Sequence, residues 1–313
     1  MKTKIPYLSG SFRSVIKADA LRGFTNKYRG ESSSFQDIRD THTLELHYRA
    51  GRPWFFNDHC FIEDSEGHLH LFGINNPYPE DGGVLYQFHP FISHFITDDP
   101  MGEWRPVGFA LDESEGTEYL GAPFVFPLHH GGYGMIFEAL HQGRRVMEMA
   151  RSPDLIEWSR LGKPLFEELG YTKRDPCVVV DRGVYRIYLC NPTKNHSVVT
   201  LAETEDFETF SYTDILKIED GSDYGGIESP FIFHFGSTFY LFFTYAHRHY
   251  YETMVIQSER HDSFSMDNCV TTLFGHASEI LTYKGTTYLS STGPEDYQEL
   301  NDHGVNLIEL KWK

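Results

Sequence analysis

The feature that most constrains this chain is a strand, turn and strand pattern that recurs five times along its length. Each copy has an apolar strand, a short turn and an aromatic-rich second strand, as in CVVVDRGVYRIYLC and FIFHFGSTFYLFFTY. Such a pair around a short Gly-containing turn predicts a β-hairpin. The turn glycines recur at intervals of roughly 50 to 65 residues, at Gly67, Gly132, Gly183, Gly236 and Gly285. A period of this length is typical of repeat architectures.

Further strand signals follow several of the hairpins, after short segments that close on an aromatic residue. These residues are Trp104, Trp158 and Phe210. The repeating unit is therefore a four-stranded antiparallel sheet, and five such sheets around a central funnel predict an all-β, single five-bladed β-propeller. Radial closure protects sheet edges that would otherwise be exposed. A two-sheet sandwich with irregular loops is the alternative, and it explains the strands but not their regular recurrence.

The domain organisation follows from the absence of any linker rich in Pro, Gly or Ser. We expect residues 1–313 to form one catalytic β-propeller domain. Residues 1–40, with Gly30 and the run Ser32–Ser34, look irregular, and we expect them to wrap the outside or help close the ring.

The charge balance limits the partners of this chain, because its formal net charge is -18. Such a charge repels phosphate backbones and anionic lipid headgroups, so we expect neither nucleic acid nor a membrane as a partner. A small neutral oligosaccharide is compatible with it. The first twenty residues lack the apolar core of a secretory signal, and the four cysteines contain no C-x-x-C pair. We therefore expect buried free thiols and a cytoplasmic protein.

Acidic residues recur just before the first strand of three hairpins. They are Asp58, which lies nine residues before its turn glycine, and Asp175 and Glu228, which each lie eight before theirs. These near-equivalent positions predict that the three carboxyl groups converge at one end of the funnel. Each motif alone is also an ordinary turn, because Asp and Ser bond local backbone and Pro fixes the bend.

Converging carboxylates repel one another unless they take different protonation states. Glycoside cleavage uses that division, because one protonated carboxyl gives its proton to the leaving oxygen while an ionised one attacks or activates water. A third anion can stabilise the positive charge that develops at the sugar ring carbon. The trio therefore predicts a glycosidase.

Three motifs carry a resemblance to known enzymes. RPWFFNDHCFIEDSEGHLHLFG resembles the nucleophile motif of glycoside hydrolase family 32, RDP at residues 174–176 matches its second signature, and IESP at residues 227–230 is similar to its Glu-Cys-Pro motif. The order of the motifs is also similar to that of family 43, whose propellers act on arabinofuranosides and xylosides. His59 stands where family 32 has Pro, Ser229 replaces Cys, and no C-terminal β-sandwich follows, which favours the family 43 arrangement.

The resemblance implies a role for each matching residue. Asp58 is the nucleophile or, in the family 43 manner, the general base; Glu228 is the general acid, and Asp175 stabilises the transition state and orients the sugar. The implied substrate-binding residue beside them is Arg174, whose guanidinium can donate two hydrogen bonds to adjacent hydroxyls. The other expected substrate-binding residues are Trp54, Asn57, Arg248 and His276. His276 resembles a fifth-blade His of family 43 that lies near an axial calcium ion. The resemblance therefore implies one of two arrangements at His276, a calcium site or an axial water network.

The function expected from residues and resemblance together is release of fructofuranosyl or arabinofuranosyl units from the non-reducing end of oligosaccharides. RDP favours fructose. Family 32 retains the anomeric configuration and family 43 inverts it, so the stereochemical outcome stays open. The alternatives are a glycosyl transferase or phosphorylase on the same scaffold, or a non-catalytic sugar-binding propeller.

Overall fold

The computed structural model describes residues 4–21, 54–77, 91–112, 119–141, 144–169, 173–221, 226–246, 248, 250–292 and 304–313. Over these residues the strands form five four-stranded sheets, so the predicted all-β five-bladed propeller is confirmed. The described residues group into two compact units. Unit 1 draws on Met1–Phe12, Pro164–Thr292 and Leu307–Lys313, and unit 2 on Arg13–Lys163 and Gly293–Asn306. No helix among the described residues is long and apolar enough to cross a membrane.

Unit 2 contains blades 1 and 2. Blade 1 is built from β2 (Trp54–Glu63), β3 (Leu69–Pro77), β4 (Phe91–Thr97) and β5 (Arg105–Asp112). Blade 2 is built from β6 (Leu120–Pro127), β7 (Tyr133–His141), β8 (Arg144–Ser152) and the short β9 (Ser159–Arg160).

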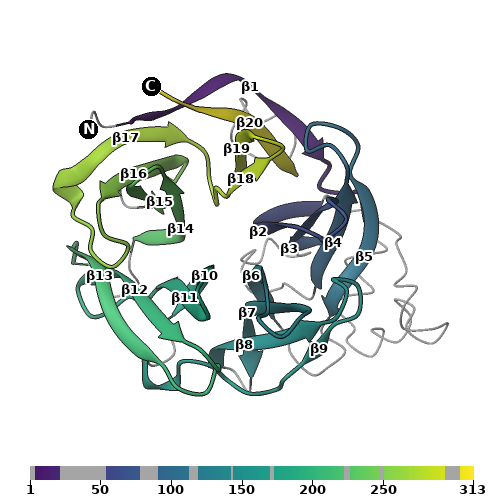
Figure 1. Cartoon of the computed structure of the whole chain (residues 1–313), viewed down its shortest axis with the longest axis horizontal. Helices are drawn as coiled ribbons and strands as arrows, with labels where there is room; N and C mark the ends of the chain where they lie inside the picture. The colour runs from purple at the N-terminus through teal and green to yellow at the C-terminus, as the bar shows by residue number, and fades with distance from the viewer. Residues whose placement is uncertain are drawn as a thin grey trace. The chain divides into compact units, whose positions relative to one another are not determined.

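Unit 1 contains blades 3 and 4 and part of blade 5. Blade 3 is β10 (Arg174–Asp181), β11 (Val184–Cys190), β12 (His196–Thr204) and β13 (Ser211–Glu219), preceded by the 3-10 turn η6 (Glu167–Leu169). Blade 4 is β14 (Ile227–Phe235), β15 (Thr238–Tyr245), β16 (Glu252–Ser258) and β17 (Cys269–Phe274), with η7 (Met266–Asn268) before the last strand. Figure 1 labels the strands of each blade in sheet order.

The predicted hairpins join the first two strands of every blade. Their turn glycines all have positive φ, between 67° and 91°, a region that favours Gly because it has no Cβ; they are Gly67, Gly132, Gly183, Gly236 and Gly285. The repeat read from the sequence is therefore a repeat of backbone conformation.

The aromatic residues that close the third segment also recur in structure, between the third and fourth strands. The Trp104 indole donates to the Pro100 carbonyl at 3.0 Å, and the Trp158 indole donates to the Leu155 carbonyl at 3.0 Å. In blade 2 the Asp154 carboxylate also accepts from the Ile156 and Glu157 N–H groups, each at 2.9 Å. These local bonds satisfy backbone groups that the turn would otherwise leave unpaired.

Blade 5 contains both ends of the chain, in the strand order β1 (Pro6–Ile16), β20 (Val305–Trp312), β19 (Thr286–Ser291) and β18 (Ile280–Tyr283). Figure 1 shows β1 in purple beside β20 in yellow. The expectation that residues 1–40 are irregular is wrong for residues 6–16, because β20 pairs with them; of the remainder, residues 22–40 lie outside the described ranges. The terminal strands are further tied by reciprocal bonds between Ile5 and Lys313, at 3.0 and 3.1 Å.

Gly304, just before β20, allows a close approach to the end of β1. A Cβ added at Gly304 would lie 1.8 Å from the Ile16 carbonyl oxygen, and backbone cannot yield as a flexible side chain can. We predict that Gly304→Ala lowers the free energy of unfolding by about 2 kcal/mol or more, measured by urea denaturation. Gly10→Ala is the control for a nearby glycine, because a Cβ there meets nothing within 4 Å, although its positive φ of 96° adds some strain. If Gly304→Ala lowered the free energy of unfolding by no more than Gly10→Ala does, the steric explanation would be contradicted.

The described cysteines form no disulfide. Cys60, Cys177 and Cys190 are buried, as expected, whereas Cys269 is exposed at the start of β17. The prediction of four buried thiols is therefore wrong for Cys269, whose strand is the last in its sheet.

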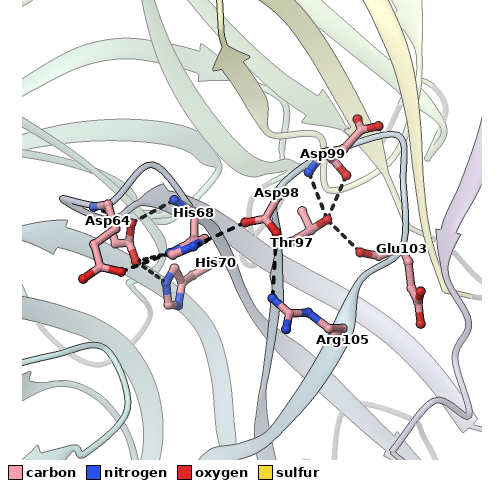
Figure 2. Close-up of polar contacts among 9 residues, drawn as sticks. Asp64, His68, His70, Thr97, Asp98, Asp99, Glu103 and Arg105 are labelled. Atoms are coloured by element: carbon pink, nitrogen blue, oxygen red, sulfur yellow. Dashed lines mark hydrogen bonds and ion pairs between the residues drawn. The ribbon is translucent and has the colours of Figure 1, made fainter.

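An Asp and His network holds the β2–β3 turn of blade 1 (Figure 2). The Asp64 carboxylate lies 3.1 Å from His68 Nδ1 and 3.3 Å from His70 Nε2. Behind it, His70 Nδ1 lies 2.8 Å from His94 Nε2. Burial would raise the pKa of Asp64, but hydrogen bonds from His68, His70 and the Glu66 N–H outweigh burial and lower it to about 2. The turn is thus joined to the interior of its own blade.

The two inner histidines should make the protein less stable in mild acid. Burial lowers the pKa of His70 and, still more, that of His94, so the unfolded chain takes up protons near pH 6.5 that the folded chain does not. Stability is then lost as pH falls below about 6.5. The pKa of His68 is instead raised by its hydrogen bond to Asp64, so its contribution is fully present below pH 6.5 and is lost as pH rises through the raised pKa of the folded state.

We predict that the free energy of unfolding falls by about 1 kcal/mol or more between pH 7.5 and 5.5. His94→Phe should reduce this loss, because Phe can keep the stack on Phe72, where the ring centroids are 4.2 Å apart, and has no proton to take up. Urea denaturation at both pH values measures the difference. An unchanged pH dependence in the variant would show that His94 is not its source.

Candidate active site

The first strand of each of blades 1 to 4 contains a break in pairing register near its start. The breaks fall between Phe56 and His59, Gly121 and Phe124, Arg174 and Cys177, and Glu228 and Phe231. At such bulges a strand re-aims its side chains, and they are common beside active sites.

The backbone is strained at these bulges. In blades 2, 3 and 4 the break contains a non-Gly residue with positive φ between 41° and 54°: Ala122, Asp175 and Ser229. Ala277, just before β18 of blade 5, also has positive φ, at 47°. The left-handed region is unfavourable for residues with a Cβ, and such strain clusters at functional sites. The bulges therefore mark one end of each first strand as the place to look for chemistry.

Pairing register shows that the predicted acids do not occupy one identical position. Asp175 is the first residue skipped by the break, Asp58 is the second in its own blade, and Glu228 immediately precedes the break. Counting back from the turn glycines missed these offsets for two reasons. The β2–β3 turn has five residues between Glu63 and Leu69, whereas the turns of blades 3 and 4 have two, and the glycine is the second turn residue in blade 3 but the first in blade 4. The positions are near-equivalent, as predicted, and differ by one residue each.

Within unit 1, Arg174 brings the two predicted acids of blades 3 and 4 together. Its Nη2 donates to Glu228 Oε1 at 3.2 Å and to the Ile227 carbonyl at 3.1 Å. Its Nε lies 3.5 Å from Asp175 Oδ2, which also accepts from the Ser229 N–H at 3.0 Å. Three partly exposed charged side chains from two neighbouring blades thus form one group.

The electrostatic environment separates the roles that this group can play. Burial raises the pKa of Glu228, and the nearby Asp175 carboxylate raises it further. The Arg174 guanidinium and a hydrogen bond from Tyr250 act in the opposite direction, but burial outweighs them. A partly exposed carboxyl whose pKa is raised stays protonated to higher pH, and it is therefore suited to donate a proton to a substrate.

Tyr250, which the sequence analysis did not select, belongs to this group. Its side chain hydrogen-bonds Glu228, and its ring stacks on His276 with centroids 4.0 Å apart. It lies in the segment between β15 and β16, where several aromatic and His residues follow one another. The sequence contained no signal that would single out this Tyr among its neighbours.

His276 is buried, with 2% of its surface exposed. Its Nδ1 lies 3.2 Å from the Tyr250 carbonyl oxygen, which can only accept, so Nδ1 donates and Nε2 has the lone pair. Burial lowers the pKa of His276 to about 4, so the ring is neutral near pH 7. The contacts of His276 are with protein groups, and its predicted contact with substrate stays a prediction.

The described residues do not fit a protein-held calcium site at His276. Among them, no three or more His, Cys, Asp or Glu side chains are grouped so as to hold a metal ion. Calcium takes six to eight oxygen ligands, and a single imidazole nitrogen does not supply them. No step of the chemistry below is therefore assigned to a metal.

Trp54, Asn57 and Asp58 lie together on β2 in unit 2. The Trp54 side chain is buried, with 2% exposed, whereas Asn57 and Asp58 are half-buried. The Asn57 carbonyl accepts from His59 Nδ1 at 3.2 Å, which ties the bulge to the strand beyond it. Placement of Asp58 beside the unit 1 acids remains a prediction.

Arg248 lies in the turn after β15, and its side chain is exposed. Its side chain is 58% exposed and pairs with Glu252 at 3.2 Å. This is a surface ion pair, and such pairs contribute little to stability. Its neighbours His247 and His249 lie outside the described residues.

Comparison with known proteins places this fold among glycoside hydrolases. The RS223 β-xylosidase has a TM-score of 0.63 and 14% identity over 82% of this chain and 92% of that chain. CoXyl43, a family 43 β-xylosidase/α-arabinofuranosidase from a compost microbial metagenome, in complex with xylotriose and in a calcium-free form, has a TM-score of 0.62 and 14% identity over 82% and 91%. The family 32 β-fructofuranosidase BmSUC1 of Bombyx mori has a TM-score of 0.62 and 15% identity over 91% and 66%.

These likenesses establish that the chain has the five-bladed propeller fold of family 43 and family 32 glycoside hydrolases, at low sequence identity. No protein-family model matches the sequence, and no curated protein matches it. The predicted structural resemblance is confirmed, and activity has to be argued from the site.

Proposed function

We propose that this protein is a glycoside hydrolase that releases furanosyl units from the non-reducing end of neutral oligosaccharides. The observation that carries the proposal is the group formed by Glu228, Asp175 and Arg174. A carboxyl with raised pKa, a second carboxylate and a guanidinium lie together on a fold shared with glycosidases. That combination supplies a proton donor and groups able to orient sugar hydroxyls.

In the proposed reaction, Glu228 gives its proton to the glycosidic oxygen as the bond to the anomeric carbon breaks. Asp58 either attacks that carbon or removes a proton from the attacking water. Asp175 stabilises the positive charge that develops on the ring, and Arg174 binds adjacent hydroxyls. After departure, Glu228 is ionised beside Arg174 and must be reprotonated, or remove a proton from water, before the next cycle.

The furanosyl preference is supported by motif and by comparison. RDP at residues 174–176 resembles the family 32 signature, and a fructan 1-exohydrolase from Cichorium intybus, in complex with 1-kestose, shares the fold at 15% identity. Family 43 neighbours are described with xylotriose and xylose, so xylosides are the competing pyranoside substrates. All these sugars are neutral, which is compatible with the net charge of -18.

The direct test is a panel of short fructans, arabinans and xylo-oligosaccharides, with nitrophenyl furanosides and nitrophenyl xylosides beside them. We expect monosaccharide release from a furanoside, followed by chromatography, with proton NMR of the first product giving its anomeric configuration. Turnover of xylosides alone would overturn the furanosyl preference. Turnover that needs added phosphate or a sugar acceptor would overturn hydrolysis in favour of a phosphorylase or transferase, and binding without turnover would indicate a sugar-binding propeller.

An experimental structure would test the placement of Asp58. Separation of its carboxyl from that of Glu228 by about 5–5.5 Å would favour retention, and roughly 6.5–9.5 Å would favour inversion. A distance greater than a monosaccharide can bridge would remove Asp58 from the reaction.

A further inference from the structure

Tyr250 occupies an unusual position for a residue in a connecting segment. It is 38% exposed, yet one face of its ring is stacked on buried His276 at 4.0 Å between centroids and an interplanar angle of 26°. Its own carbonyl accepts a hydrogen bond from the same imidazole at 3.2 Å. Two contacts with one buried residue therefore hold both the ring and the backbone of Tyr250.

His276 is itself rigidly held. Its backbone N–H donates to Ser291 Oγ at 2.9 Å, and its backbone carbonyl accepts from the Thr292 N–H at 3.1 Å. Tyr251 packs edge-on against the ring, with centroids 5.8 Å apart. Blade 5 thus provides a fixed support for the segment that leads into β16.

The side chain of Tyr250 forms a hydrogen bond with Glu228, the candidate acid. Arg174 contacts the same carboxyl group, at Oε1. Glu228 is therefore held by a guanidinium from blade 3 and by a phenol whose own support, His276, lies in the segment between β17 and β18.

We propose that Tyr250 is a positioning residue for Glu228 and that His276 fixes Tyr250 for this purpose. This inference rests on the proposed function, since positioning matters only if Glu228 transfers a proton. A phenol donates to an ionised carboxylate and accepts from a protonated carboxyl, so it can hold one rotamer in both states. In this proposal His276 supports Tyr250 and contacts neither the substrate nor a metal ion.

The first test is Tyr250→Phe, which keeps the ring and its stack and removes only the hydroxyl. A hydrogen bond to the charged form lowers a pKa, so its loss should raise the pKa of Glu228 and move the alkaline limb of the kcat/KM profile to higher pH. We expect kcat to fall about 10- to 100-fold. Tyr7→Phe is the matched control, because Tyr7 is equally exposed, at 37%, and lies on β1. An unshifted profile would overturn the proposal.

A second measurement keeps this test separate from the proposed function. The ionisation of Glu228 can be followed by carbon NMR of protein labelled at the Glu carboxyl carbons, with Glu228→Gln for assignment. A higher pKa of Glu228 in Tyr250→Phe supports the contact even if no glycoside is hydrolysed, in which case only the enzyme proposal fails. An unchanged pKa would sink the positioning role whatever the activity.

The part assigned to His276 is tested by a double-mutant cycle. His276→Phe can retain the stack and loses the N–H donor to the Tyr250 carbonyl. We expect it to shift the pKa of Glu228 in the same direction as Tyr250→Phe and to add nothing in the Tyr250→Phe background, because both changes interrupt one chain of contacts. Independent, additive shifts would show that His276 does not act through Tyr250.

Discussion

Glu228→Gln is expected to lower kcat about 100- to 10,000-fold on oligosaccharides, which is the range that general acid catalysis contributes. The amide has nearly the shape of the carboxyl but cannot give up a proton to the leaving oxygen. Sugar binding should change much less, since Asp175 and Arg174 remain. The variant should also lose the alkaline limb of the pH profile, because the group whose pKa burial raises is absent.

The leaving group gives this prediction its sharpest form. The dinitrophenol group of a dinitrophenyl glycoside leaves as a stable phenolate anion and needs little protonation. The loss of activity in Glu228→Gln should therefore be far smaller on this substrate than on an oligosaccharide. Glu259→Gln is the control, because it makes the same chemical change at an exposed position of unit 1. Equal losses on both substrates would mean that Glu228 is not the acid, and unchanged activity would remove it from the site.

Arg160→Ala is expected to destabilise blade 2 by about 3–5 kcal/mol, as is usual when one partner of a buried ion pair is removed. Arg160 Nε and Nη2 donate to Glu148 Oε2 at 3.1 and 2.6 Å, and the two side chains are only 6% and 0% exposed. The pair joins the two-residue strand β9 to β8. Without the guanidinium, the buried Glu148 carboxylate has lost the charged partner that offsets the cost of its desolvation.

Urea denaturation of Arg160→Ala, followed by Trp fluorescence, measures this loss. The double variant Glu148→Leu/Arg160→Met should recover much of it, because an apolar pair of similar volume avoids the desolvation of both charges. Arg182→Ala is the control for loss of an Arg, since its side chain is 93% exposed beside Asp181 and should change stability by no more than about 0.5 kcal/mol. A loss as small as that of Arg182→Ala would contradict a structural role for the pair.

The blades were predictable because their signals are local. A Gly at positive φ between two apolar runs specifies a hairpin from a few adjacent residues, and five such turns recur at the expected places. β1 was missed for the opposite reason. Its residues form a strand because β20, nearly three hundred positions away, pairs with them, and they show no regular alternation of buried and exposed positions that would have predicted a strand.

The candidate site divides in the same way. Spacing identified Asp175 and Glu228, and the resemblance to family 32 added Arg174; the structure brings these three side chains together within unit 1. The one-residue offsets between the acids depend on bulges and turn lengths, which counting along the chain does not reveal. Tyr250 and the burial of His276 were equally invisible, because aromatic and His residues are common on either side of a β-strand.

The sequence by itself determined the repeated hairpins, the acidic net charge and the acidic and basic side chains available for chemistry, because these depend on composition and on neighbours a few residues apart. Only the tertiary structure decided which carboxyl is desolvated, which guanidinium contacts it, and which phenol and imidazole support it. The physical reason is that burial and hydrogen bonding act between residues some 25 to 55 positions apart in the chain, such as Arg174 with Glu228 and Tyr250 with His276, and packing alone sets those distances.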